Sequence, residues 1–143
     1  MSNLSLFLKK NKKVKENTTF AATKSLLDET GKPLEWQIKP LTTKENETIR
    51  EACTIELPVK GKPNMFRPKL NTSDYLSKMM VASISEPNLY DADLQDSYGV
   101  KTPDDLLKEI IDDPGEYNDL AAFIQKFNGF NTTLDDKVEE AKN

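Results

Sequence analysis

Two helix starts marked by proline constrain the fold of the second half of this chain. Thr102-Pro103-Asp104-Asp105 and Asp113-Pro114-Gly115-Glu116 each place a capping side chain before a proline, with acidic residues in the turn that follows. Proline suits the first position of a helix because its missing N–H leaves no hydrogen bond unmade, and carboxylates there interact favourably with the helix dipole. The sequence therefore predicts two helices joined by a tight connection, forming an angled pair.

Apolar residues at helical spacing extend over the rest of the second half. One helix is predicted from a cap at Thr72 or Ser73 to about Ser85, and a short helix over residues 89–98 follows it. Gly129 occupies the position at which a left-handed residue ends the last helix. We expect helices to dominate the chain after Thr72.

A β-hairpin is predicted over residues 17–41, with its turn at 29–32. The second strand places three large apolar residues on one face, alternating with polar ones: Leu34, Trp36 and Ile38. We expect Trp36 to anchor the core and to be at least half buried. Pro33 and Pro40 flank this strand and favour an edge strand or a short one.

The segment between the hairpin and the helical half predicts one helix and then an irregular region. Thr42 and Glu45 have the spacing of a capping box. Residues 57–70 contain three prolines, so we expect them to be extended or looped. Met65 and Phe66 lie in this region, which makes it a candidate either for packing on the core or for binding a partner.

The predicted fold class is therefore α+β, mainly α, with an N-terminal hairpin packed against about four helices in a single domain over residues 17–130. Residues 1–16 form an apolar and Lys-rich arm, in which a short apolar patch precedes five Lys residues between positions 9 and 15. Such a dense charge run predicts a solvated, mobile linker. Residues 131–143 form an acidic C-terminal tail with little apolar content.

The net charge of −4 conceals an asymmetry between the two halves. Residues 1–71 carry 14 Lys and Arg against 8 Asp and Glu, whereas residues 72–143 carry 6 against 16. A chain with this charge distribution is suited to head-to-tail self-association or to binding a basic partner. The acidic half disfavours nucleic-acid binding, which needs a basic face.

The residue content excludes several kinds of catalytic site. The chain has no His, which excludes Ser-His-Asp catalysis and His-ligated zinc. Its single Cys, Cys53, lies on the apolar side of the helix predicted after Thr42, so we interpret it as a packing residue. The paired acids Asp104-Asp105 and Asp112-Asp113 lie where helix starts favour carboxylates. We predict that the protein is not an enzyme and requires no metal and no cofactor, and no apolar run approaches the ~20 residues of a membrane span.

Soft or exposed apolar residues are the candidates for a partner-binding surface, because flexible binding surfaces use such side chains. The hypothesised partner-binding residues are Phe7, Leu8, Met65, Phe66, Met79 and Met80. For Met79 and Met80 the alternative is a place in the core. For the other four the alternative is that both segments fold back onto the domain.

Several short segments occur in an order that is typical of one family. They are residues 4–12, Leu34-Glu35-Trp36-Gln37-Ile38-Lys39-Pro40-Leu41, residues 94–103 with Leu106-Leu107, Pro114-Gly115-Glu116-Tyr117 and Asn128-Gly129-Phe130. Together they span nearly the whole chain, which resembles the XkdN-like phage tail assembly chaperones of prophages and tailed phages of Bacillus and related Gram-positive bacteria.

The resemblance implies a small cytoplasmic protein that acts while the tail is built and is absent from the mature virion. Its implied partners are the tail tape measure protein, which such chaperones are thought to coat and keep soluble, and the major tail tube protein. The family offers no catalytic residue.

Two other functions are consistent with the residues. One is a small nucleic-acid or anionic-surface binding protein that uses the Lys cluster between Lys9 and Lys15. The other is an inhibitor or adaptor that binds one host protein through the acidic helices.

Overall fold

The computed structural model describes residues 3–130, so the predicted acidic tail lies outside the described residues. The five helices within this range are α1 (Thr43–Ala52), α2 (Thr72–Ser83), α3 (Ala92–Ser97), α4 (Pro103–Ile110) and α5 (Pro114–Phe127). The five strands are β1 (Thr18–Phe20), β2 (Trp36–Ile38), β3 (Thr54–Pro58), β4 (Phe66–Leu70) and β5 (Ile84–Glu86). Two short 3₁₀ helices, Asn3–Phe7 and Lys9–Asn11, precede β1. The predicted mixture of helices and strands, with more helix than strand, is confirmed.

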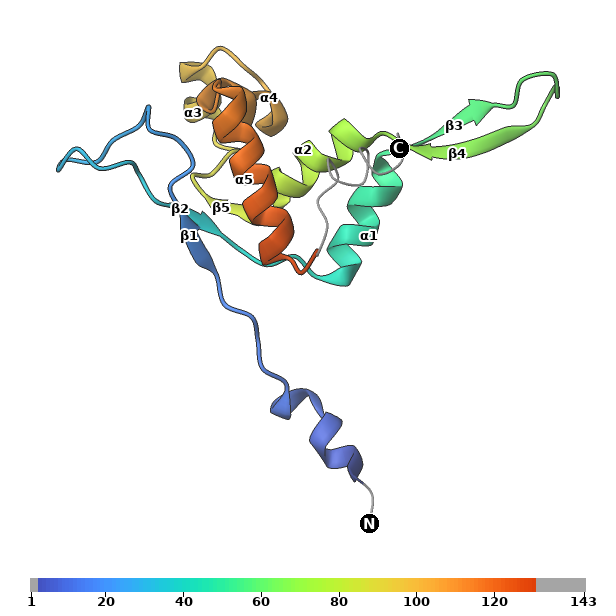
Figure 1. Cartoon of the computed structure of the whole chain (residues 1–143), viewed down its shortest axis with the longest axis horizontal. Helices are drawn as coiled ribbons and strands as arrows, with labels where there is room; N and C mark the ends of the chain where they lie inside the picture. The colour runs from blue at the N-terminus through green and yellow to red at the C-terminus, as the bar shows by residue number, and fades with distance from the viewer. Residues whose placement is uncertain (1–2, 131–143) are drawn as a thin grey trace.

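A three-stranded antiparallel sheet in the order β1-β2-β5 forms one side of the body (Figure 1). Thr18 pairs with Ile38 and Phe20 with Trp36, and β5 pairs with the other edge of β2. The strand β2 is therefore short, as expected, but it is central and not an edge. Pro33 and Pro40 lie outside its three paired residues, so neither removes a donor from the ladder.

The loop between β1 and β2 forms a turn near the expected place. Leu27 and Pro33 form an isolated bridge, and the amide of Gly31 donates to the carbonyl of Asp28 at 3.0 Å. The side chain of Asp28 also accepts from the backbone N–H groups of Thr30 and Lys32. The turn thus spans residues 28–32.

The core lies between the sheet and the helices α2, α4 and α5. Trp36 is only 2% exposed, which confirms its expected burial. Leu34, expected on the same face, is 40% exposed, and it precedes the paired residues of β2. The buried residues of the three helices include Tyr75, Met79, Met80, Leu106, Leu107, Ile110, Leu120 and Ile124.

The helix starts follow the predicted caps with one exception. The side chains of Thr102 and Asp113 accept from the amides of Asp105 and Glu116, and Thr42 with Glu45 forms a capping box. For α2 the cap is Asn71, whose side chain accepts from the amide of Asp74, and not Thr72 or Ser73.

The end of α2 also differs from the prediction. The helix ends at Ser83, not at about Ser85, because Ile84–Glu86 pair with β2 as β5. This change from helix to strand occurs without a linker, so the polypeptide passes from the helical layer into the sheet at Ile84.

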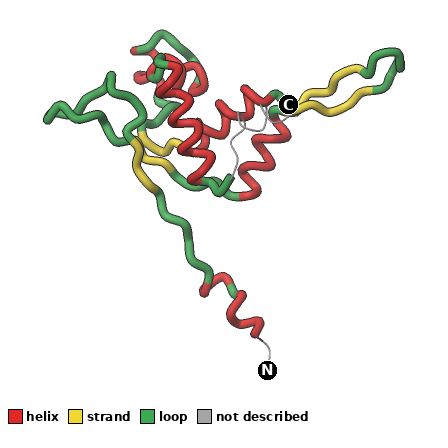
Figure 2. Tube along the Cα trace, viewed as in Figure 1, coloured by secondary structure: helices red, strands yellow, loops and turns green. Residues whose placement is uncertain are grey.

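Two segments extend away from the body: the N-terminal arm before β1 and the ribbon formed by β3 and β4 (Figures 1 and 2). The ribbon pairs Thr54 with Leu70 at its base and Pro58 with Phe66 near its tip. The prediction of an extended, non-helical region over 57–70 is confirmed.

Candidate functional site

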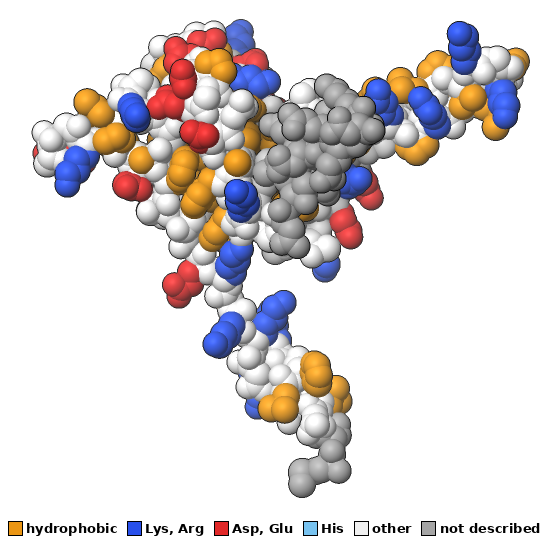
Figure 3. Space-filling view, viewed as in Figure 1, with side chains coloured by type: hydrophobic (Ala, Val, Ile, Leu, Met, Phe, Trp, Pro, Cys, Tyr) orange, Lys and Arg blue, Asp and Glu red, His pale blue; other side chains and the backbone are white. Residues whose placement is uncertain are grey.

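Exposed large apolar residues are concentrated outside the body. On the arm Phe7 is 82% exposed and Leu8 47%, and on the ribbon Met65 is 53% and Phe66 60% exposed. None of these four side chains is packed in the core, so the structure places them on the two extensions, on different sides of the molecule (Figure 3). They do not form one continuous surface.

Met79 and Met80 lie elsewhere. They are 1% and 0% exposed on the inner side of α2, where they pack with the core. The alternative of a core position therefore describes this structure, and neither side chain is part of its surface. Their helical spacing alone did not distinguish an exposed stripe from a buried one.

The hydrogen-bond pattern of the ribbon places one proline on the outer edge of each strand. The amide of Val59 donates to the carbonyl of Met65, and that of Asn71 to the carbonyl of Cys53. Hydrogen-bonded and non-hydrogen-bonded pairs therefore alternate along the two strands between these two bonds. Pro68 opposes Glu56 in a non-hydrogen-bonded pair, so its missing N–H would lie on the outer edge of β4. Pro58 opposes Phe66 in another such pair, so the outer edge of β3 also lacks one N–H and keeps those of Thr54 and Glu56.

One face of the ribbon combines apolar and basic side chains. Ile55 and Leu57 lie on β3 directly opposite Lys69 and Arg67 on β4, and residues opposite each other share a face. Figure 3 shows basic and apolar side chains next to one another along this extension. The ribbon is therefore an amphipathic surface with a positive charge, held away from the acidic body.

The ribbon tip adopts a defined turn. Asn64 has a φ of 64° and Gly61 a φ of 78°, and the amides of Lys62 and Met65 donate to the carbonyls of Val59 and Lys62. Asn and Gly are the residues that adopt the left-handed region most readily. This turn places Met65 and Phe66 at the far end of the ribbon.

The arm is held at its base by an aromatic stack. The ring of Phe20 stacks on Phe123, with centroids 4.4 Å apart, and Phe123 stacks on Phe127. The Nζ atom of Lys15 lies 4.2 Å from the centroid of Phe127, a cation–π contact. Lys15 thus contacts the body, while Phe7 and the Lys residues between 9 and 13 are exposed beyond it.

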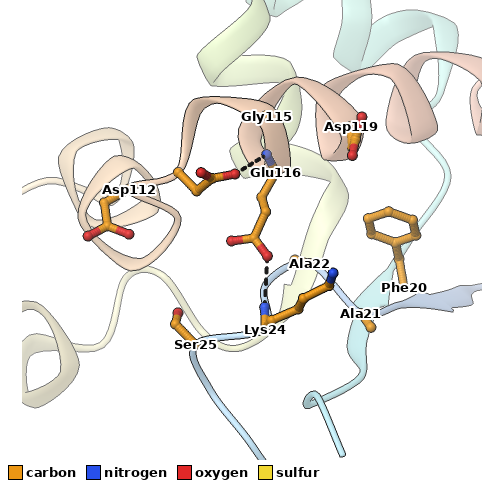
Figure 4. A pocket seen from close by; sticks show the side chains of 10 residues that line it. Phe20, Ala21, Ala22, Lys24, Ser25, Asp112, Gly115, Glu116 and Asp119 are labelled. Carbon is orange, nitrogen blue, oxygen red and sulfur yellow. Dashed lines mark hydrogen bonds between the residues drawn. The ribbon is translucent and has the colours of Figure 1, made fainter.

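A depression of about 720 Å³ lies between the β1–β2 loop and the start of α5 (Figure 4). The carboxylate of Glu116 accepts from the hydroxyl of Thr23 at 2.7 Å and from the amide of Lys24 at 2.8 Å. Asp113 caps α5. Glu116 thus holds the loop against the helix, and Asp113 is used as the helix cap.

Two further ionisable groups of the body, Cys53 and Lys78, are accounted for by burial and by a structural contact. Burial raises the pKa of the Cys53 thiol to about 11, which makes it a poor nucleophile at neutral pH. Lys78 bonds to Asp104 at 3.1 Å, and this contact raises the lysine pKa. Among residues 3–130 no group of three or more His, Cys, Asp or Glu side chains could hold a metal ion. Within the same range no helix has the length and apolar character needed to cross a bilayer.

Comparison with known proteins identifies a family whose sequences match this chain. Residues 4–142 match the family described as phage XkdN-like tail assembly chaperone protein. The phage-like element PBSX protein XkdN of Bacillus subtilis (strain 168) is 26% identical over 99% of this chain and 94% of its own length. The uncharacterised protein YqbN of the same strain is 24% identical over 99% of this chain and 93% of its own.

A solved structure has the same fold. The crystal structure of the protein YqbN superposes with a TM-score of 0.77 over 92% of this chain and 99% of that chain, at 18% sequence identity.

Proposed function

The chain belongs to the XkdN-like phage tail assembly chaperones, and from this premise we propose that it binds the tape measure protein, the tail tube protein or both while the tail is built. It acts in the cytoplasm of the bacterial host, without catalysis and without a cofactor, and leaves before the particle is complete. The observation that carries this proposal is the concentration of exposed apolar residues on two extensions of an otherwise well-packed body.

The proposed contact uses Phe7 and Leu8 on the arm and Met65 and Phe66 on the ribbon. A few apolar anchors carry most of the affinity of an interface, whereas charged rims govern association rate and specificity. The Lys residues of the arm and Arg67 with Lys69 on the ribbon supply such rims. A long helical partner with apolar seams and acidic flanks would be covered by these extensions.

The extensions also suit a partner that must later be released. A two-stranded ribbon on its own is marginally stable, so it adapts to its partner at little cost in folding free energy of the body. Contacts that depend partly on exposed charge pairs are weakened by competing charges and by salt. Arrival of tube subunits along the tape measure would displace the chaperone without unfolding it.

The test is co-expression with the tape measure protein of the same phage, measuring the soluble fraction of the latter. We expect Phe66→Ser and Phe7→Ser each to lower that fraction relative to the parent chaperone. Tyr90→Ser is the matched control, because Tyr90 is 69% exposed but lies outside both extensions. If folded Phe66→Ser and Phe7→Ser chaperones keep the tape measure protein as soluble as the parent does, the proposed contact is wrong.

A further inference from the structure

The two faces of the β3–β4 ribbon differ in charge and in polarity. On one face, Ile55 and Leu57 of β3 lie opposite Lys69 and Arg67 of β4, and we call these four residues the apolar–basic face. Ile55 is 47% exposed, Leu57 is half-buried, and both basic side chains are exposed. Among residues 3–130 no ion pair involves Arg67 or Lys69. This face therefore offers an apolar row beside two cations that are free to meet a partner's carboxylates.

The opposite face of the ribbon is acidic at its base. Side chains alternate along a strand, so Glu56 points away from the face that carries Ile55. It borders a depression of about 430 Å³ whose lining comes from α1 and β3: Glu47, Arg50, Glu51, Thr54 and Glu56. Three carboxylates against one guanidinium give this side a negative charge, which would repel an acidic partner. An acidic partner is therefore directed to the apolar–basic face.

Both edges of the ribbon are poorly suited to an added strand. Strand addition uses a continuous row of N–H and C=O groups along the edge of a sheet. Pro58 and Pro68 each remove one N–H from an outer edge of this short ladder. We therefore expect a partner to cover a face of the ribbon and not to extend the ladder.

An amphipathic helix fits the dimensions of the apolar–basic face. The strands pair over five residues each, which at ~3.3 Å per residue gives a length of about 17 Å. A helix of about three turns has this length, and residues spaced three and four apart form a continuous stripe along it. The stripe would pack on Ile55 and Leu57, while carboxylates on its flank would bond to Arg67 and Lys69.

The same face is less suited to nucleic acid. Proteins that bind single strands combine a basic groove with aromatic rings on which the bases stack. The aromatic residue of the ribbon is Phe66, which lies opposite Pro58 on the face that carries Glu56. The aliphatic row of Ile55 and Leu57 offers neither base stacking nor a bond to phosphate. The combination of side chains therefore favours a protein partner.

We propose that the apolar–basic face binds an acidic amphipathic helix of a tail protein, about three turns long. The helix lies along the ribbon, with its apolar stripe on β3 and its carboxylates against Arg67 and Lys69 on β4. This inference rests on the proposed function and deepens it, since it assigns the contact to one face and defines the chemistry of the partner. Phe66 then makes a separate contact from the other face.

The first experiment compares two charge reversals of equal size in the full chain, co-expressed with the tape measure and tail tube proteins of the same phage. Arg67→Glu with Lys69→Glu should lower the amount of tail protein that co-purifies at least ~10-fold, because both new charges repel the partner. Lys60→Glu with Lys62→Glu is the matched control, since both residues lie in the turn beyond the paired strands. The control should stay within ~2-fold of the parent, because it changes only exposed charges outside the contact.

The outcomes separate this inference from the proposed function. If the two folded double variants behave alike, the apolar–basic face is not the contact and the proposal is overturned. If Phe7→Ser and Phe66→Ser then still lower the solubility of the tape measure protein, the proposed function stands and only the face is wrong. A parent chain that retains neither tail protein would overturn both.

The second experiment identifies the bound segment by photo-cross-linking. Cys53 is buried, and burial raises the pKa of its thiol to about 11, so at neutral pH a benzophenone maleimide reacts with an introduced thiol instead. From Ile55→Cys we expect cross-links to a tail-protein peptide that has apolar residues at helical spacing and an acidic flank. Glu56→Cys, on the opposite face, is the control and should give few. Cross-links from Ile55→Cys to a basic segment or to nucleic acid, their absence, or equal yields from both positions would each overturn the proposal.

Discussion

At the residue scale, single polar side chains join segments that lie far apart in the sequence. Glu116 accepts hydrogen bonds from Thr23 and from the amide of Lys24, more than ninety positions earlier. Thr23 is 2% exposed, so its hydroxyl depends on protein partners. This pair closes the β1–β2 loop over the start of α5.

We expect Glu116→Ala to lower the free energy of unfolding by about 1–3 kcal/mol, because it removes an acceptor from a buried hydroxyl and from a backbone amide. Asp119→Ala is the control: it lines the same depression but is exposed. Urea unfolding followed by tryptophan fluorescence of Trp36 measures both. Equal stability of the two variants would show that Glu116 contributes little.

Cys53 gives a second prediction at this scale. Burial raises its pKa to about 11, above the ordinary value of 9.0, so folding favours the neutral thiol. That contribution to stability is complete below pH 9 and is lost as the pH rises toward 11. At pH 8 we expect slow reaction of the native protein with a thiol reagent and rapid reaction of one thiol per chain in urea. Rapid reaction of the native protein would contradict the burial of Cys53.

At the element scale, the end of α5 depends on one backbone conformation. Gly129 has a φ of 90°, and the amides of Gly129 and Phe130 donate to the carbonyls of Lys126 and Gln125. These two bonds form the Schellman motif, which ends helices at a left-handed residue. The prediction of a left-handed Gly129 from its position is confirmed.

Gly129→Ala should destabilise the protein by about 1 kcal/mol, since a Cβ disfavours the left-handed region. Gly129→Asn should cost less, because Asn adopts that region more readily than Ala. The measurement is the thermal midpoint of unfolding of the two variants beside the parent. An Ala variant as stable as the parent would contradict this account of the helix end.

The ribbon should be dispensable for folding. We expect replacement of residues 56–68 by Asn-Gly to change the free energy of unfolding by no more than about 1 kcal/mol, because β3 and β4 contain no buried residue. The design keeps Ile55 paired with Lys69, and Asn-Gly suits a two-residue hairpin turn. Chemical denaturation checks it. A variant that fails to fold would mean that the ribbon supports the body.

The elements that the sequence predicts well are those with local signals. Proline starts and capping side chains defined α4 and α5, and alternation placed Trp36 in the core. The strand β5 was missed because three residues after a helix carry no periodicity, and its partner β2 is 46 or more positions away. The ribbon was expected only as an extended or looped region, because residues 57–70 contain three prolines. Pro58 and Pro68 nevertheless join the ladder, since their nitrogens lie on its outer edges, where no hydrogen bond is needed.

Only the structure shows which partner-binding candidates are exposed and which are buried. Helical spacing is the same for a buried stripe of residues and for an exposed one, so it did not decide the place of Met79 and Met80. The packing of α2 buries both side chains. No short-range signal identified the apolar groove beside Trp36, because its lining residues Leu34, Glu86 and Tyr98 come from three different segments. Long-range packing is the information that composition and periodicity lack.

At the scale of the whole molecule, basic charge and exposed apolar side chains both occur on the two extensions. The basic first half supplies the arm and the ribbon, which carry the exposed Phe7 and Phe66, and the acidic second half supplies most of the helical body (Figure 3). Under the proposed function the two extensions bind the tail protein, and the body holds them apart from each other. Mutations on the extensions should therefore alter binding while the stability of the body is unchanged.

The most direct test of this account is hydrogen exchange of the chaperone alone and bound to the tape measure protein. We predict added protection of ribbon amides, centred on Met65 and Phe66, with the exchange of α2 and α5 unchanged. Protection confined to the acidic helices, with the ribbon exchanging as it does in the free protein, would contradict the account.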